Sequence, residues 1–82
     1  MKTVFLVYET DRNLMKSSRV LVAACTSLKS AVTVVINELH KKGLITTAEF
    51  GNVRNILKEQ KQTQNYDENF FIDEIELNKI LN

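Results

Sequence analysis

The chain has 82 residues, of which 44% are apolar and 26% are charged, and this balance indicates one folded domain over residues 1–82 rather than a disordered segment. Its formal net charge of +1 excludes strong attraction of the whole molecule to nucleic acid. With a single cysteine and a single histidine, the chain can form neither an internal disulfide nor a four-ligand Cys/His metal cage, so we expect no metal and no cofactor.

The apolar stretches are too short for a membrane protein. None approaches the roughly 20 residues that a membrane helix needs. The apolar run at 4–8 is followed at once by Glu9, which is not typical of a signal peptide. We therefore expect a cytoplasmic protein, in its producing cell or in a host, without a membrane partner.

Two strands are predicted at the start of the chain. Residues 3–9 are apolar on both alternating sets, which predicts a central strand with both faces at least partly covered. Residues 19–25 repeat this pattern. Because the two segments are close in sequence, an antiparallel hairpin with residues 11–18 as its long loop is expected.

A helix is predicted over residues 28–42. Its apolar residues recur at helical spacing, from Leu28 through Leu39, and form a broad stripe. Thr26 or Ser27 can cap its first turn, and Gly43 stands where a left-handed terminating residue belongs.

A second helix is predicted after the capping box from Thr46 to Glu49. Its apolar stripe is narrower and consists of Phe50, Val53, Ile56 and Leu57. The polar, uncapped residues 61–65 predict a frayed end.

The last predicted strand covers residues 70–77, and its register is left open. Strict alternation would place Asp73 with Phe71 and Ile75, whereas a bulge near 73–74 would bring Ile72 and Ile75 to one side. Residues 79–82 either continue the strand or pack as a tail.

These elements predict an α+β fold in the order β-β-α-α-β, with a three-stranded, mostly antiparallel sheet and two helices. The first strand should be central. The first helix is apolar enough to cover one sheet face, and the other face requires the second helix or another copy of the chain. A chain this short stabilises itself only marginally, so a homodimer is expected.

The order of elements resembles that of small uncharacterised bacterial and phage proteins. The resemblance lies in the opening strand 4–9, the strand and helix over 20–39, and the closing segment Phe71-Ile72-Asp73-Glu74-Ile75-Glu76-Leu77-Asn78. It covers most of the chain as a pattern of element types, and the second helix departs from it. It implies a fold and a mobile-element origin, and it carries no functional residues across.

Catalytic chemistry is not indicated. His40 stands beside two lysines at a helix end, where a solvated cation is the simpler interpretation. Cys25 precedes a helix start, which can depress a thiol pKa, but its sequence neighbours include no base, and a buried thiol is the commoner case. We predict that the protein is not an enzyme.

Charged side chains supply the candidate binding surfaces. The acids from Asp67 to Glu76 could bind a hard cation, imitate a nucleic-acid backbone or simply solubilise an edge strand, which is the commonest case. The bases at 54, 58 and 61 would share one helix face, and those at 12, 16 and 19 surround the hairpin loop. The residues singled out for partner or ligand binding are Arg12, Lys16, Arg19, Arg54, Lys58, Lys61, Asp73, Glu74 and Glu76.

The leading functional hypothesis is a non-catalytic binding protein that self-associates. Such a protein could be an accessory or inhibitor protein of a phage or mobile element that acts on a host macromolecule. The alternative is a protein that binds or sequesters a small anionic ligand, with Arg12, Lys16 and Arg19 as its anion contacts. A nucleic-acid-binding accessory protein is the third hypothesis. It ranks below the other two because no aromatic side chain that could stack on a nucleobase accompanies the lysines and arginines.

Overall fold

A computed structural model describes residues 3–14 and 18–76 of the chain, and it has the predicted α+β order of elements. The elements are β1 (Thr3–Thr10), β2 (Val20–Cys25), α1 (Leu28–Lys41), a short 3-10 turn η2 (Thr47–Glu49), α2 (Phe50–Gln60) and β3 (Asn69–Glu76). The sheet has the order β2-β1-β3, and β1 is antiparallel to both neighbours. The prediction that the first strand is central is confirmed.

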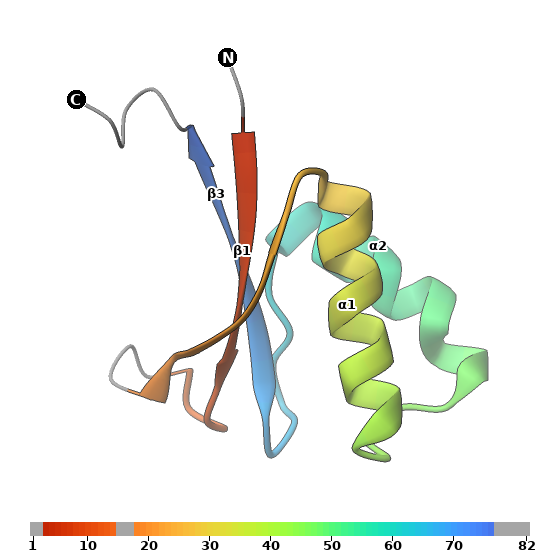
Figure 1. The fold of residues 1–82 in the computed structure, drawn as a ribbon. Helices are drawn as coiled ribbons and strands as arrows, with labels where there is room; N and C mark the ends of the chain where they lie inside the picture. The colour runs from red at the N-terminus through yellow and green to blue at the C-terminus, as the bar shows by residue number, and fades with distance from the viewer. Residues whose placement is uncertain (1–2, 15–17, 77–82) are drawn as a thin grey trace.

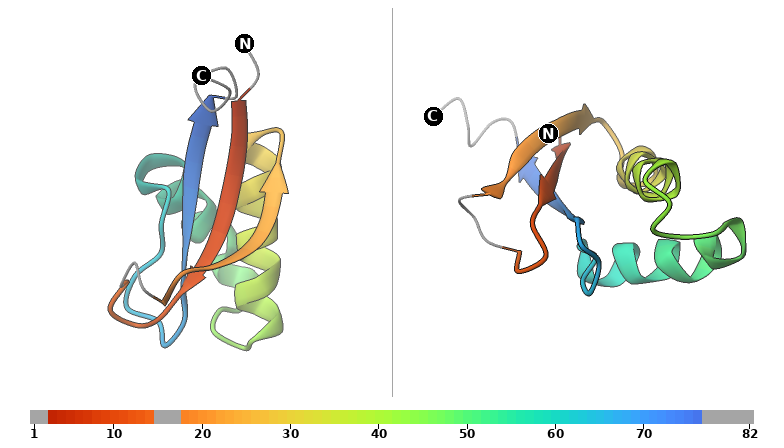
Figure 2. Two further views of the ribbon diagram at one scale, coloured as in Figure 1. Left: turned by 60° about the vertical axis from the view of Figure 1, so that its left-hand side comes forward. Right: turned by 90° about the horizontal axis from the view of Figure 1, so that it is seen from below.

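Both helices lie on the same side of the sheet (Figures 1 and 2). The predicted stripe of α1 faces the strands and is buried at Ala31, Val32, Val35, Ile36 and Leu39. α2 packs beside α1 through the buried Val53 and Leu57 instead of crossing to the other side of the sheet. The first helix therefore covers one sheet face as predicted, and neither helix covers the opposite face, so that face has no layer from residues 3–14 and 18–76.

The hydrophobic core lies between the sheet and α1. Val7 of β1 and Ile72 of β3 are directly opposite each other and are buried. Phe70 is fully buried next to them. Since successive strand residues point to opposite faces, the neighbouring residues Leu6 and Phe71 point away from this core.

The predicted helix ends are confirmed. The Ser27 hydroxyl oxygen accepts a hydrogen bond from the Ser30 N–H at 3.1 Å and caps α1. Gly43 has φ +75°, a left-handed conformation that glycine adopts without steric cost. Before α2, the Glu49 Oε1 accepts hydrogen bonds from the Thr46 N–H at 3.0 Å and the Thr46 hydroxyl at 3.1 Å, as expected from the capping box.

The prediction that residues 61–65 fray is wrong. Lys61 adopts a left-handed conformation with φ 57°, which ends α2 and turns the chain toward the sheet. The Ile72 N–H then donates to the Lys61 carbonyl at 2.8 Å, and the Thr63 N–H donates to the Phe70 carbonyl at 2.9 Å. These long-range bonds hold the segment along the outer edge of β3, and nothing in its local composition indicates them.

The register of β3 is regular. It pairs with β1 without interruption from Thr3 opposite Glu76 to Thr10 opposite Asn69, so the strict-alternation option is the observed one. The irregularity lies in β2 instead, between the pairs Val7–Ala23 and Tyr8–Leu21, where Val22 is the extra residue. The predicted continuation at 77 and the tail at 79–82 lie outside the described residues.

Candidate functional site

One side of the sheet forms an apolar surface that no other described element covers. We call it the uncovered sheet face. Leu6 lies opposite Ala24 and Asp73, and Tyr8 lies opposite Leu21 and Phe71. The side chain of Leu21 is 55% exposed. The apolar residues of this face are Val4, Leu6, Tyr8, Leu21, Ala24, Phe71 and Ile75.

Two charged residues stand on the uncovered sheet face. The Arg19 guanidinium carbon lies 4.2 Å from the centre of the Phe71 ring, an attractive cation–π contact. Its Nε is buried and has no hydrogen-bond partner among the described residues. Asp73 follows two residues after Phe71 on the same face, and neither Arg19 nor Asp73 forms an ion pair within the described chain. Among the residues that the structure describes, the face thus carries one unpaired charge of each sign.

The two edges of the sheet differ. The outer edge of β3 is bonded to the segment at 61–63. β2 contains no charged residue, and Val20 at its start is 60% exposed. Edge strands are commonly protected by charges or bulges, and here only the bulge at Val22 is present. The exposed apolar area therefore extends from the uncovered sheet face onto β2.

A second surface lies on the helix side of the sheet, between α1 and α2. It is a groove of about 630 Å³, which we call the basic groove. Its apolar wall comes from Leu28 and the buried Val32 of α1. Its residues are Leu28, Lys29, Val32, Thr33, Arg54 and Lys58.

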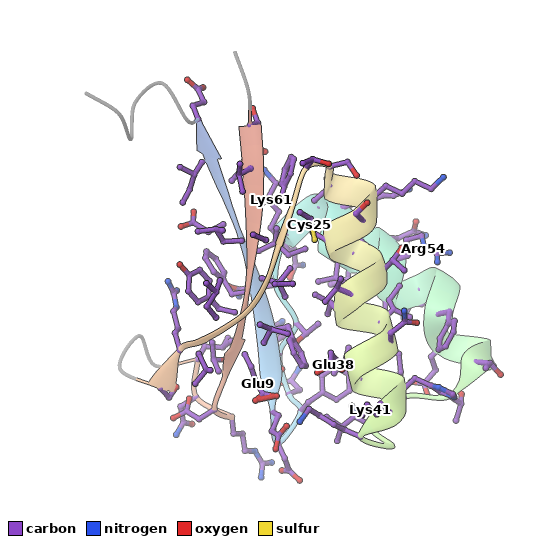
Figure 3. The ribbon with its side chains drawn as sticks, viewed as in Figure 1. Glu9, Cys25, Glu38, Lys41, Arg54 and Lys61 are labelled. Carbon is purple, nitrogen blue, oxygen red and sulfur yellow. The ribbon has the colours of Figure 1, made fainter. Side chains whose placement is uncertain are left out.

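The predicted basic stripe of the second helix is only partly correct. Arg54 and Lys58 both line the basic groove, and Figure 3 shows Arg54 beside α1 while Lys61 lies next to the strands. Lys61 is outside α2, and its Nζ donates to the Glu74 Oε1 at 3.0 Å. Placing Lys61 on the same helix face was wrong, because α2 ends at Gln60 and the left-handed turn redirects the chain.

The remaining predicted residues do not form one site. Arg12 is exposed, lies 3.6 Å from the Asp67 carboxylate and is not among the groove residues. Lys16 lies outside the described residues. Asp73 points to one side of β3, and Glu74 and Glu76, opposite Phe5 and Thr3, point to the other side. The acidic strand therefore does not present all three carboxylates together.

Two acids meet elsewhere, around Lys42 at the end of α1. The Lys42 Nζ lies 2.6 Å from the Glu68 carboxylate and 3.0 Å from that of Glu9. The hydrogen bond to Glu68, followed by that to Glu9, raises the pKa of Lys42, and the same bond to Lys42 lowers the pKa of Glu68. One ammonium group thus binds both carboxylates and leaves the cluster with a net charge of −1. Over residues 3–14 and 18–76 no group of His, Cys, Asp or Glu side chains is arranged to hold a metal ion.

Cys25 and His40 are separated by the length of α1. Cys25 precedes the helix and is half-buried against the core, so the expectation of a buried thiol holds only in part. The exposed His40 lies in the last turn and contacts the Phe50 ring edge-on at 5.3 Å. A helix of 14 residues is about 20 Å long, so these two side chains cannot act as a nucleophile and base pair.

Sequence reasoning missed two charged residues that the fold places in clusters. Lys29 joins Arg54 and Lys58 in the basic groove, and Lys42 binds Glu9 and Glu68. Periodicity places Lys29 beside the stripe residue Leu28, but its position next to Arg54 and Lys58 depends on how the two helices pack. The Lys42 cluster joins three distant segments, and no local signal predicts it.

No protein-family model matches the chain, and neither a curated protein nor a solved structure matches it. Within the described residues, none of the helices has the length and apolar character required to cross a bilayer.

Proposed function

We propose that the protein is a non-catalytic binding protein that self-associates through its uncovered sheet face. The observation that carries the proposal is an apolar sheet face with no covering layer in the described chain. A sheet normally buries one or both faces against another layer, and exposed apolar patches on small proteins often mark interaction sites.

A second copy of the chain is the proposed occupant because the face is complementary to itself in charge. Arg19 and Asp73 are each unpaired in the described chain and lie on the same face. In a two-fold symmetric dimer, Arg19 of each copy can meet Asp73 of the other, which forms two equivalent pairs. The bulge at Val22 disfavours edge-to-edge pairing through β2, so the two faces are expected to stack as in a β-sandwich.

The size of the face indicates a weak dimer. Strands about 4.8 Å apart with a rise of about 3.3 Å per residue give three strands a face of roughly 14 by 26 Å, or about 370 Å². Two such faces span about 740 Å² in projection, a small flat area beside the roughly 1,200–2,000 Å² of accessible surface that stable complexes bury. We therefore expect a dissociation constant in the micromolar range or above.

Sedimentation equilibrium on two charge variants tests the proposal. Arg19→Asp places two acids opposite each other in the symmetric dimer, and Asp73→Arg places two bases there, so each variant alone should remain monomeric. An equimolar mixture of the two should associate, because every contact in the mixed dimer then joins opposite charges.

Two controls make the result specific. Asn52→Asp changes the charge at an exposed position of α2 and should leave the association unchanged. Circular dichroism should show that both face variants remain folded. A wild-type protein that stays monomeric at millimolar concentration, or a mixture that associates no better than either variant, would overturn the second copy as the occupant.

The phage or mobile-element origin suggested by the sequence resemblance remains a separate prediction, as does action on a host macromolecule. The genes that neighbour this one would test the origin. The absence of catalysis is likewise proposed, and any activity found in the purified protein should survive both Cys25→Ala and His40→Ala.

A further inference from the structure

The cations of the described chain fall into two groups. Arg12, Lys42 and Lys61 each lie beside a carboxylate, and Arg19 lies over the Phe71 ring. Lys29, Arg54 and Lys58 form no ion pair with any described residue, and all three line the basic groove. Lys41, which is also unpaired there, stands at the opposite end of α1 (Figure 3).

The clustering of these three cations is electrostatically unfavourable in the free protein. Arg54 and Lys58 are four residues apart on α2, where like charges repel each other. Lys29 approaches them from the first turn of α1, and no acidic residue lines the groove. An anion bound there would relieve the repulsion and would also interact favourably with the N-terminal end of α1.

The groove is not purely polar. Leu28 is half-buried and Val32 almost fully buried, and together they give it an apolar wall beside the charged rim. The volume of about 630 Å³ is in the usual range of small-molecule sites, roughly 300–1,000 Å³. No aromatic side chain lines the groove, which disfavours the base stacking used by single-stranded nucleic acid.

We propose that the basic groove binds a small amphipathic anion, with a carboxylate or phosphate head held by Arg54, Lys58 and Lys29 and an apolar body lying against Leu28 and Val32. Guanidinium groups bind carboxylates and phosphates through paired hydrogen bonds, so Arg54 provides the directional contact. The site is on the helix side of the sheet and does not depend on self-association.

The test is a titration of ¹⁵N-labelled protein with octanoate, followed by amide chemical shifts. The largest shifts should occur at groove residues. Octanol has the same chain without the charge and should bind at least about tenfold more weakly, since a charge-assisted hydrogen bond contributes about a factor of ten. Acetate has the head without the chain and should also bind at least about tenfold more weakly, since it buries no apolar surface against Leu28 and Val32.

Two double variants with equal charge loss decide whether the groove is the site. Arg54→Gln with Lys58→Gln should weaken octanoate binding by about tenfold or more. Arg12→Gln with Lys41→Gln removes the same two charges outside the groove and should change the affinity by less than about twofold, because it lowers only the net charge.

Equal losses in the two double variants would overturn the proposal, as would octanol binding as tightly as octanoate, or shifts confined to the uncovered sheet face. Leu21→Glu, which alters the proposed dimer surface, should bind octanoate normally. A failure of octanoate to bind in the basic groove and a failure of the chain to self-associate are therefore distinguishable.

Discussion

Asn69 is the buried polar residue on which the turn before β3 depends. Its Nδ2 donates to the Tyr66 carbonyl at 2.9 Å, and its Oδ1 accepts from the Thr63 hydroxyl at 3.1 Å. The Thr63 hydroxyl oxygen also accepts from the Phe70 N–H at 2.9 Å. Because Asn69, Thr63 and Phe70 are buried, the loss of the Asn69 side chain leaves buried partners unsatisfied.

We predict that Asn69→Ala lowers the free energy of unfolding by about 2–3 kcal/mol, the cost of several buried groups without partners. Urea denaturation followed by circular dichroism measures it. Asn13→Ala is the matched control, because Asn13 is exposed. Its backbone N–H, not its side chain, donates the hydrogen bond to the Asp11 carboxylate. A loss below about 0.5 kcal/mol for Asn69→Ala would show that water replaces these bonds.

The Lys42 cluster predicts a dependence of stability on pH. Glu68 has a pKa below its ordinary value of 4.5 because of its hydrogen bond to Lys42. A group whose pKa is lowered by folding contributes stability that is fully present above the unfolded pKa and disappears as the pH falls through the folded pKa. Lys42 has the opposite shift, so its contribution is retained until strongly alkaline pH.

We therefore expect Lys42→Met to be less stable than the wild type at pH 7, with the difference shrinking as the pH falls from about 4.5 downward. Unfolding curves at several pH values measure this difference. Lys41→Met is the control, since Lys41 is exposed and forms no ion pair within residues 3–14 and 18–76. A difference that is constant from pH 7 to pH 3 would contradict the assignment to Glu68.

At the scale of elements, the two glycines should respond in opposite directions to the same substitution. Gly43 ends α1 with φ +75°, where a side chain is strained although no atom lies near the added Cβ. Gly51 lies inside α2 with ordinary backbone angles and free space around the added Cβ. Only the backbone conformation differs between the two sites.

We predict that Gly43→Ala lowers the free energy of unfolding by about 1 kcal/mol and that Gly51→Ala raises it by about 0.5–1 kcal/mol, because alanine favours a helix interior but not the left-handed region. Denaturant unfolding of the two variants beside the wild type measures both signs. If the two substitutions shifted stability in the same direction, the assigned end of α1 or the helical state of Gly51 would be incorrect.

Elements were predictable where their signal is local. The stripe from Leu28 to Leu39, the Ser27 cap and Gly43 together specify α1 within one residue of its observed end. The course of 61–65 was not predictable, because it depends on Ile72 and Phe70, which bond to this segment from another element. The bulge at Val22 is set by pairing with β1 and has no local marker.

The candidate surfaces were likewise predictable where the sequence signal is local and unpredictable where contacts between elements decide. Apolar residues on both alternating sets of β1 predicted that both faces of the sheet must pack against another layer. Both helices lie on one side of the sheet, so no described element covers the other face. The basic groove was only half predictable: the spacing of Arg54 and Lys58 placed them on one face of α2, whereas the contribution of Lys29 depends on how the two helices pack.

At the scale of the whole molecule, self-association and stability are coupled. A dimer that forms only from folded chains stabilises the fold by mass action, so the melting temperature rises with protein concentration once this exceeds the dissociation constant. The gain per chain is about 0.7 kcal/mol for each tenfold excess, half of the usual 1.4 kcal/mol, because free monomer rises only as the square root of the total concentration. For a domain of this size, 1 kcal/mol corresponds to roughly 4–8 °C.

We predict that the melting temperature of the wild type rises by several degrees when the protein concentration is raised from about 10 µM to about 1 mM. This range spans the dissociation constant that we expect for a weak dimer. Leu21→Glu should abolish this rise, because it places a charge on the uncovered sheet face. Leu21 is already 55% exposed, so the substitution should leave the fold of the single chain intact. At low concentration the two proteins should melt within about 4 °C of each other, since exposed substitutions change stability by less than about 0.5 kcal/mol. Differential scanning calorimetry with repeated scans checks reversibility. Parallel rises in both proteins would place the association elsewhere on the molecule.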